Sequence, residues 1–158
     1  MIIHLLLGSN LGNRIENLQK ARQLITEQAG RLVAVSSEYE TEPWGFSSNN
    51  MFLNQAIAVE TDLLPDKVLT VTESIEKQAG RKEKTCLHTY KDRIIDIDLL
   101  LADNIVLNTD KLTVPHPFMH DRLFVMQPLC EIAPDVLHPV FKKTIRQLLE
   151  DLLKSINQ

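Results

Sequence analysis

Two stretches of the chain, LVAVSSEY at residues 32–39 and FLNQAIAVET at residues 52–61, decide the fold. The first is rich in β-branched and small residues and the second alternates two sets of side chains, so both are predicted to be strands. Residues 43–50 between them are predicted to form a loop. Side chains two positions apart share one face of a strand, which places Phe52 and Asn54 on the same face.

A strand and a helix are predicted before this pair. Residues 2–7 are a short apolar run typical of a buried strand. Asn13 with Glu16 resembles a capping box at the start of the helix, and Gly30 follows its end. The apolar stripe of this helix is formed by Leu11, Ile15, Leu18, Ala21 and Ile25.

A helix and a strand are also predicted after the pair. Pro65 occupies the first position of the helix, and Gly80 ends it. Residues 95–101 alternate and predict a strand, residues 104–114 a hairpin, and residues 145–156 one more amphipathic helix. One face of the strand carries Ile95, Ile97, Leu99 and Leu101, and the other carries Asp96, Asp98 and Leu100.

The predicted order β, α, β, β, α, β is that of ferredoxin-like folds. We therefore expect an α+β protein with an antiparallel sheet, helices packed on it and a C-terminal extension, in one domain over residues 1–158. No run approaches the ~20 apolar residues of a membrane span, and no secretory signal is recognisable, so a cytoplasmic protein is expected. Cys86 and Cys130 fit neither a disulfide scaffold nor a zinc site.

The net charge of −4 disfavours sequence-independent binding of nucleic acid. Residues 81–93 are the exception, because they hold five basic residues against two acidic ones. Arg81, Lys84 and Arg93 in this segment can form charge-assisted hydrogen bonds to phosphate oxygens. No Walker A motif is present, so a bound nucleotide would need another architecture.

Asp96 and Asp98 share a strand face with their Cα atoms about 6–7 Å apart, and they need a cationic partner in an otherwise apolar strand. An arginine or lysine could be that partner, and so could Mg²⁺ completed by phosphates and water. His116 between two prolines, together with Arg122, could contact a phosphate.

Aromatic side chains form a further candidate group. Trp44, Phe52 and Phe124 are in or beside segments that also carry Thr41, Pro43 and Asn54. Aromatic residues usually belong to the core, but two that face each other can hold a flat heterocycle while an asparagine amide pairs with its edge.

These residues resemble the 6-hydroxymethyl-7,8-dihydropterin pyrophosphokinase family of folate biosynthesis over nearly the whole chain. The stretches that carry the resemblance are Gly8-Ser9-Asn10-Leu11-Gly12, Ser36-Ser37-Glu38-Tyr39-Glu40-Thr41, Phe52-Leu53-Asn54, Ile75-Glu76 to Gly80-Arg81, Arg93-Ile94-Ile95-Asp96-Ile97-Asp98, Val114-Pro115-His116-Pro117 with Arg122-Leu123-Phe124, and Pro128-Leu129-Cys130-Glu131-Ile132-Ala133-Pro134.

The resemblance implies transfer of pyrophosphate from ATP to the hydroxymethyl oxygen of the dihydropterin, with release of AMP. It implies two Mg²⁺ ions on Asp96 and Asp98, and Arg81 and Arg93 as catalytic residues. The nucleotide would contact Glu76, Lys84, Thr113, His116 and Arg122. The pterin would contact Thr41, Pro43, Trp44, Phe52, Asn54 and Phe124. ATP and the pterin are the expected partners of a monomer.

The loops at residues 43–50 and 81–93 are the expected lids of this site. The second loop is about two residues longer than the family pattern, and its usual aromatic corresponds to Tyr90 or to His88. Three rival functions remain: a regulatory domain that senses a nucleotide or pterin, an RNA-recognition module, and a metal-dependent phosphohydrolase. A product assay separates them.

Overall fold

Strand β1 (Ile2–Ser9) is the centre of an antiparallel sheet and pairs with β4 (Phe52–Glu60) on one side and β5 (Asp96–Ala102) on the other. This computed structural model describes residues 1–42, 50–79 and 93–157. Strand β2 (Arg31–Val35) completes the order β2-β4-β1-β5, and β3 (Tyr39–Thr41) also pairs with β4. The predicted ferredoxin-like sheet is confirmed.

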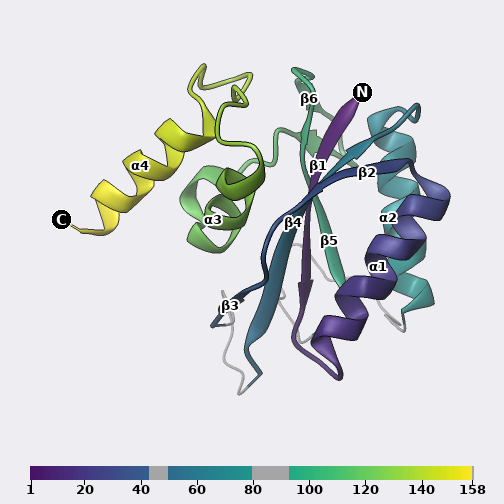
Figure 1. The fold of residues 1–158 in the computed structure, drawn as a ribbon. Coiled ribbons are helices and arrows are strands. Elements are labelled where there is room, and N and C mark those ends of the chain that lie inside the picture. The colour runs from purple at the N-terminus through teal and green to yellow at the C-terminus, as the bar shows by residue number, and fades with distance from the viewer. Residues whose placement is uncertain (43–49, 80–92, 158) are drawn as a thin grey trace.

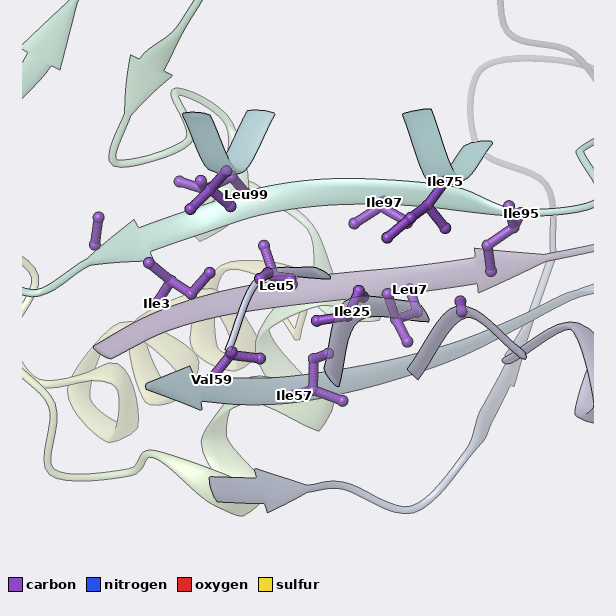
Figure 2. Close-up of a cluster of buried hydrophobic side chains, with 14 of the residues drawn as sticks. Ile3, Leu5, Leu7, Ile25, Ile57, Val59, Ile75, Ile95, Ile97 and Leu99 are labelled. Atoms are coloured by element: carbon purple, nitrogen blue, oxygen red, sulfur yellow. The ribbon is translucent and has the colours of Figure 1, made fainter. Parts of the chain in front are cut away.

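Two layers of helices cover the sheet, one on each face (Figure 1). Helices α1 (Arg14–Gln28) and α2 (Pro65–Gln78) pack on one face, where Figure 2 shows the buried aliphatic side chains of the sheet meeting Ile25 and Ile75. Helices α3 (Leu123–Ile132) and α4 (Ile145–Ile156) pack on the other. In the described ranges, no helix is long and apolar enough to span a membrane.

The predicted starts of α1 and α2 agree with the structure, whereas Gly80, the predicted end of α2, lies outside the described residues. The Asn13 side chain accepts a hydrogen bond from the backbone N–H of Glu16, and Pro65 is the first residue of α2. The prediction that Leu11 and Ile15 belong to the buried stripe is wrong, because Leu11 lies before the start of α1 and Ile15 is 57% exposed. Leu18, Ala21 and Ile25 carry the packing instead.

The prediction of one continuous strand at residues 32–39 is wrong. The structure has two strands there, because β2 ends at Val35 and β3 begins at Tyr39. Ser36 lies at the break, where its hydroxyl accepts a hydrogen bond from the N–H of Ala56 at 2.9 Å. A serine side chain can replace a main-chain partner in this way, so the sheet is interrupted without leaving the β4 backbone unpaired.

Leu101 was expected on the same face as Leu99, and this expectation is wrong. Leu5 pairs with Leu99 while His4 pairs with Leu101, so Leu100 is an extra residue in β5. This β-bulge reverses the alternation, and Leu101 packs with Leu100 under α3 and α4.

The sequence patterns did not predict α3. The helix contains Pro128 and has no side-chain cap, which are two features that normally argue against a helix. Burial of Val125, Met126 and Leu129 against the sheet stabilises it. Between β5 and α3 lie the predicted hairpin, made of β6 (Leu107–Asn108) and β7 (Thr113–Val114), and the short 3₁₀ helix η1 (Met119–Asp121).

Candidate active site

Two carboxylates of β5 lie on the sheet face that α3 and α4 cover farther along. Asp96 pairs with Gly8 of β1, and Asp98 pairs with Leu6. The residues that alternate with them are buried under α1 and α2, as Figure 2 shows, so the carboxylates point to the opposite face. The predicted common face of Asp96 and Asp98 is confirmed, and both side chains are partly exposed.

Gly8 lies between this carboxylate pair and a polar and aromatic group on β4. It pairs with Asn54 on one side and with Asp96 on the other. A Cβ atom on Gly8 would lie 3.2 Å from Oδ1 of Asn54 and 3.5 Å from Cδ1 of Phe52. Phe52 and Asn54 therefore occupy the same face as the carboxylates, and Gly8 places no side chain between them.

Asn54 is held in one orientation by β3. Its amide Nδ2 donates a hydrogen bond of 2.7 Å to Oγ1 of Thr41, and the residue is buried, with 3% of its surface exposed. Thr41 pairs with Phe52 in the β3–β4 ladder. The structure thus brings together three of the residues predicted to contact the pterin.

The backbone of Arg93 is fixed by Asn10, in the turn that follows β1. Arg93 N donates to Oδ1 of Asn10 at 2.6 Å, and Asn10 N donates to the carbonyl of Arg93 at 2.9 Å. Nδ2 of Asn10 also donates to the carbonyl of Asn50. No role was expected for Asn10 from the sequence, although an asparagine in a turn after a strand is a common source of such contacts.

His116 lies beside β5, because its N–H donates to the carbonyl of Leu100 at 2.9 Å. Desolvation by burial, with a smaller effect of the Arg122 charge, lowers the pKa of His116 to about 4. Its Nδ1 accepts a hydrogen bond from the N–H of Phe118, so the proton of the neutral ring is on Nε2. His116 is therefore an uncharged hydrogen-bond donor near neutral pH.

Arg122 and Phe124, at the start of α3, contact each other. The guanidinium carbon of Arg122 lies 5.9 Å from the centroid of Phe124 and 5.5 Å from that of Phe118, within the range of cation–π attraction. Arg122 is buried, with 8% of its surface exposed. Arg122, which is predicted to contact phosphate, and Phe124, which is predicted to contact the pterin, are therefore in direct contact with each other.

Glu76 and Thr113 have partners of their own. Oε2 of Glu76, buried on α2, accepts a hydrogen bond from Ile97 N at 3.0 Å, which fixes the strand between the two aspartates. The hydroxyl of Thr113 donates to Oδ1 of Asn108 within the β6–β7 hairpin. These contacts give both residues a structural role.

Four predicted site residues lie outside the described residues, at 43–49 and 80–92: Arg81, Lys84, Pro43 and Trp44. The two expected lids and the choice between Tyr90 and His88 lie there as well, apart from the loop ends at Asn50 and Arg93.

The carboxylate pair suits a metal ion that takes most of its ligands from elsewhere. Among residues 1–42, 50–79 and 93–157, no group of three or more His, Cys, Asp or Glu side chains could enclose a metal. Two carboxylates alone are a typical protein contribution to a Mg²⁺ site, because substrate phosphates and water complete the octahedron. Asp96 and Asp98 fit that role.

Comparison with known proteins identifies the family. The family model for 7,8-dihydro-6-hydroxymethylpterin-pyrophosphokinase (HPPK) matches residues 4–134. The chain belongs to the HPPK family. The resemblance inferred from the sequence motifs is thereby confirmed, and the matched range contains every predicted site residue.

Several bacterial relatives are similar to this chain in sequence over most of their length. A protein of Porphyromonas gingivalis is 44% identical over 139 residues, which are 87% of this chain and 94% of the relative. A protein of Aquifex aeolicus is 39% identical over 145 residues, which are 92% of this chain and 88% of the relative. Both are named 2-amino-4-hydroxy-6-hydroxymethyldihydropteridine pyrophosphokinase.

Solved structures containing an HPPK unit share the fold. Two crystal structures of Plasmodium falciparum HPPK-DHPS triple mutants superpose with TM-scores of 0.78 and 0.82, at 19% and 17% sequence identity. They match 99% of this chain, but the chain spans less than half the length of those proteins, 45% and 44%. At this identity the likeness shows the HPPK fold alone.

Proposed function

We propose that this chain transfers pyrophosphate from ATP to the hydroxymethyl group of 6-hydroxymethyl-7,8-dihydropterin in folate biosynthesis, with residues 1–158 as one pyrophosphokinase domain. The observation that carries the proposal is the arrangement around Gly8. Asp96 and Asp98 lie on one side of it, and Phe52 and Asn54 lie on the other, all on one face of the sheet.

The pterin side of the site is made by β3, β4 and α3. The Phe52 ring offers a stacking surface, and the Asn54 amide, oriented by Thr41, can pair with the edge of a flat heterocycle. Phe124 would supply the second aromatic surface, with Pro43 and Trp44 as further wall residues from the family resemblance.

The phosphate side is made by β5 and the segments beside it. Asp96 and Asp98 would hold Mg²⁺, two ions by the family resemblance, which when bound would neutralise the triphosphate and polarise its phosphoryl oxygens. His116 donates from Nε2 to a phosphate oxygen without adding charge, and Arg93 and Arg122 supply positive charge. Glu76, Lys84, Thr113 and Arg81 complete the proposed nucleotide contacts.

In the reaction, the pterin hydroxyl oxygen bonds to the β-phosphorus while the bond from that phosphorus to the AMP oxygen breaks. The hydroxyl proton passes to solvent, and AMP leaves. Positioning and electrostatic stabilisation supply most of the catalysis in such a transfer. Arg81 and Arg93 would stabilise the charge that develops on the transferred group and on AMP.

The experiment is to incubate the protein with ATP, Mg²⁺ and the dihydropterin and to follow AMP. Pterin-dependent AMP is expected. Asp96→Asn and Asp98→Asn should each lower the rate by about 100-fold or more, because each removes several kcal/mol of charge stabilisation. Asp110→Asn, at an exposed position of the hairpin, is the matched control and should keep wild-type activity.

The other products identify the rival functions. ADP with free phosphate would show a phosphohydrolase, and ATP binding without turnover would show a sensor. Either outcome overturns the proposal. A cytoplasmic location, a monomeric state and the absence of a nucleic-acid partner belong to the same proposal, and the net charge of −4 supports the last of these.

A further inference from the structure

Two of the motif stretches contain residues to which the proposed reaction assigns no role, and the structure joins these stretches. Ser36 to Thr41 includes β3, and Pro128 to Pro134 includes the end of α3. Tyr39 Oη donates a hydrogen bond of 2.7 Å to Oε1 of Glu131. Ser37 donates to Oε2 of Glu131 twice, from its backbone N at 2.8 Å and from its hydroxyl at 3.3 Å.

Both oxygens of the Glu131 carboxylate are thus used by donors more than ninety residues away in the sequence. The hydrogen bond to Glu131, with smaller contributions from burial and from the carboxylate charge, raises the pKa of Tyr39 to about 12. The hydrogen bond from Tyr39 lowers the pKa of Glu131 in turn. These reciprocal shifts are those of a charge-assisted hydrogen bond.

The strand register places Tyr39 beside the residues of β4 that are proposed to contact the pterin. It pairs directly with Asn54, and Thr41, two residues along the same face of β3, accepts the hydrogen bond from the Asn54 amide. On the opposite face, Glu40 forms an ion pair of 2.8 Å with Arg14 of α1. Strand β3 is therefore held by helices on both faces, and its position sets the orientation of Asn54.

Helix α3 extends the same connection to Phe124. Glu131 is seven residues after Phe124, and with 3.6 residues per turn the two side chains lie on nearly the same face of the helix, about 10 Å apart along its axis. A hydrogen bond at Glu131 restrains rotation of α3 and so restrains the direction of Phe124. Glu131 therefore joins the helix that carries Phe124 to the strand that carries Thr41, the hydrogen-bond partner of Asn54.

We propose that Glu131 is a positioning residue, which through Tyr39 and Ser37 holds β3 and α3 in the spacing that binds the pterin ring. This inference rests on the proposed function, because it takes Asn54 and Phe124 as the pterin contacts. Glu131 touches neither substrate in this role. It acts on the affinity for the heterocycle, and the carboxylate pair on β5 lies outside this connection.

The test measures KM for the pterin, KM for ATP and kcat in Tyr39→Phe, Glu131→Gln and the double variant. Tyr39→Phe removes one hydroxyl and keeps the ring, so the fold is retained. Each single change should raise KM for the pterin by about 5- to 20-fold, with KM for ATP and kcat within about 2-fold of wild type. The double variant should be no worse than the poorer single variant, because both changes break one connection.

The matched control is Asp151→Asn, which removes a carboxylate that accepts from Lys143 at 2.8 Å on the exposed part of α4. It should leave both KM values unchanged. An unchanged KM for the pterin in Tyr39→Phe and Glu131→Gln, or an equal rise of both KM values, overturns the positioning role while the proposed function stands. A wild-type protein without turnover overturns both.

Discussion

Gly8 decides how much space the candidate site has between β4 and β5. A Cβ atom at this position would come within 3.2 Å of Oδ1 of Asn54, closer than a relaxed contact, and Thr41 restrains the amide from moving away. We expect Gly8→Ala to raise KM for the pterin by about 10-fold, as loss of one good hydrogen bond would. KM for ATP, measured in the same assay, should change little, and a larger rise for ATP would contradict this explanation.

His116 provides a second prediction at the residue scale. Since its pKa is about 4, the ring is neutral near pH 7 and contributes a hydrogen bond rather than a charge. His116→Ala should raise KM for ATP by about 10-fold, whereas His116→Gln, which keeps an N–H donor, should raise it about 3-fold or less.

The pH profile tests the protonation state directly. The ratio of KM for ATP between His116→Ala and wild type should stay constant between about pH 5.5 and pH 8, because no charge on His116 is lost in that range. A ratio that falls as the pH rises through about 6.5 would mean that His116 binds ATP as a cation.

At the scale of elements, Gly30 fixes how closely the turn between α1 and β2 approaches the end of β4. A Cβ atom on Gly30 would lie 2.1 Å from the carbonyl oxygen of Glu60, and backbone at the end of a sheet strand cannot move aside easily. Gly30→Ala should lower the free energy of unfolding by about 2–4 kcal/mol in a denaturant titration.

Substitution of Gly12 by alanine is the matched control for Gly30→Ala, because it tests backbone strain without a close contact. Its φ of +68° is unfavourable for alanine, but a Cβ atom would meet only Nδ2 of Asn17, at 3.8 Å. Gly12→Ala should cost about 1 kcal/mol from backbone strain alone. If Gly30→Ala cost no more than Gly12→Ala, close approach to β4 would not be the reason for glycine at position 30.

For the whole molecule, buried histidines make stability depend on pH. Desolvation by burial lowers the pKa of His4, and it lowers those of His116 and His138 to about 4. The unfolded chain binds protons near the ordinary value of 6.5, so between about pH 6.5 and pH 4 it holds more protons than the folded chain. The stability that depends on these neutral histidines is therefore fully present above about pH 6.5, and it is lost as the pH falls toward 4.

His116 and His138 each contribute a slope of up to about 1.4 kcal/mol per pH unit, measurable as denaturant midpoints at a series of pH values. His138→Asn is the informative variant, because Nδ1 of His138 accepts hydrogen bonds from the N–H groups of Val140 and Phe141, and an asparagine oxygen can accept in its place. This variant should show a shallower loss of stability in acid. Equal slopes would assign the acid sensitivity to other groups.

The sequence by itself determined the features that depend on neighbours along the chain. Helical spacing and local caps located α1 and α2, and alternation placed Asp96 and Asp98 on one face. Together with the order of elements, these patterns were sufficient for the fold, whereas the family was recognised from the motif stretches. The short-range signal failed for α3, because burial against the sheet outweighs the effect of Pro128.

Only the tertiary structure decided which distant residues meet. The bulge at Leu100, the position of Gly8 between Asn54 and Asp96, the Asn10 contacts to Arg93 and the Glu131 contacts to Tyr39 all depend on register between strands or packing between layers. No local propensity encodes such contacts, since each of them joins side chains or backbone groups that chain proximity does not bring together. The candidate site is built almost entirely from contacts of this kind.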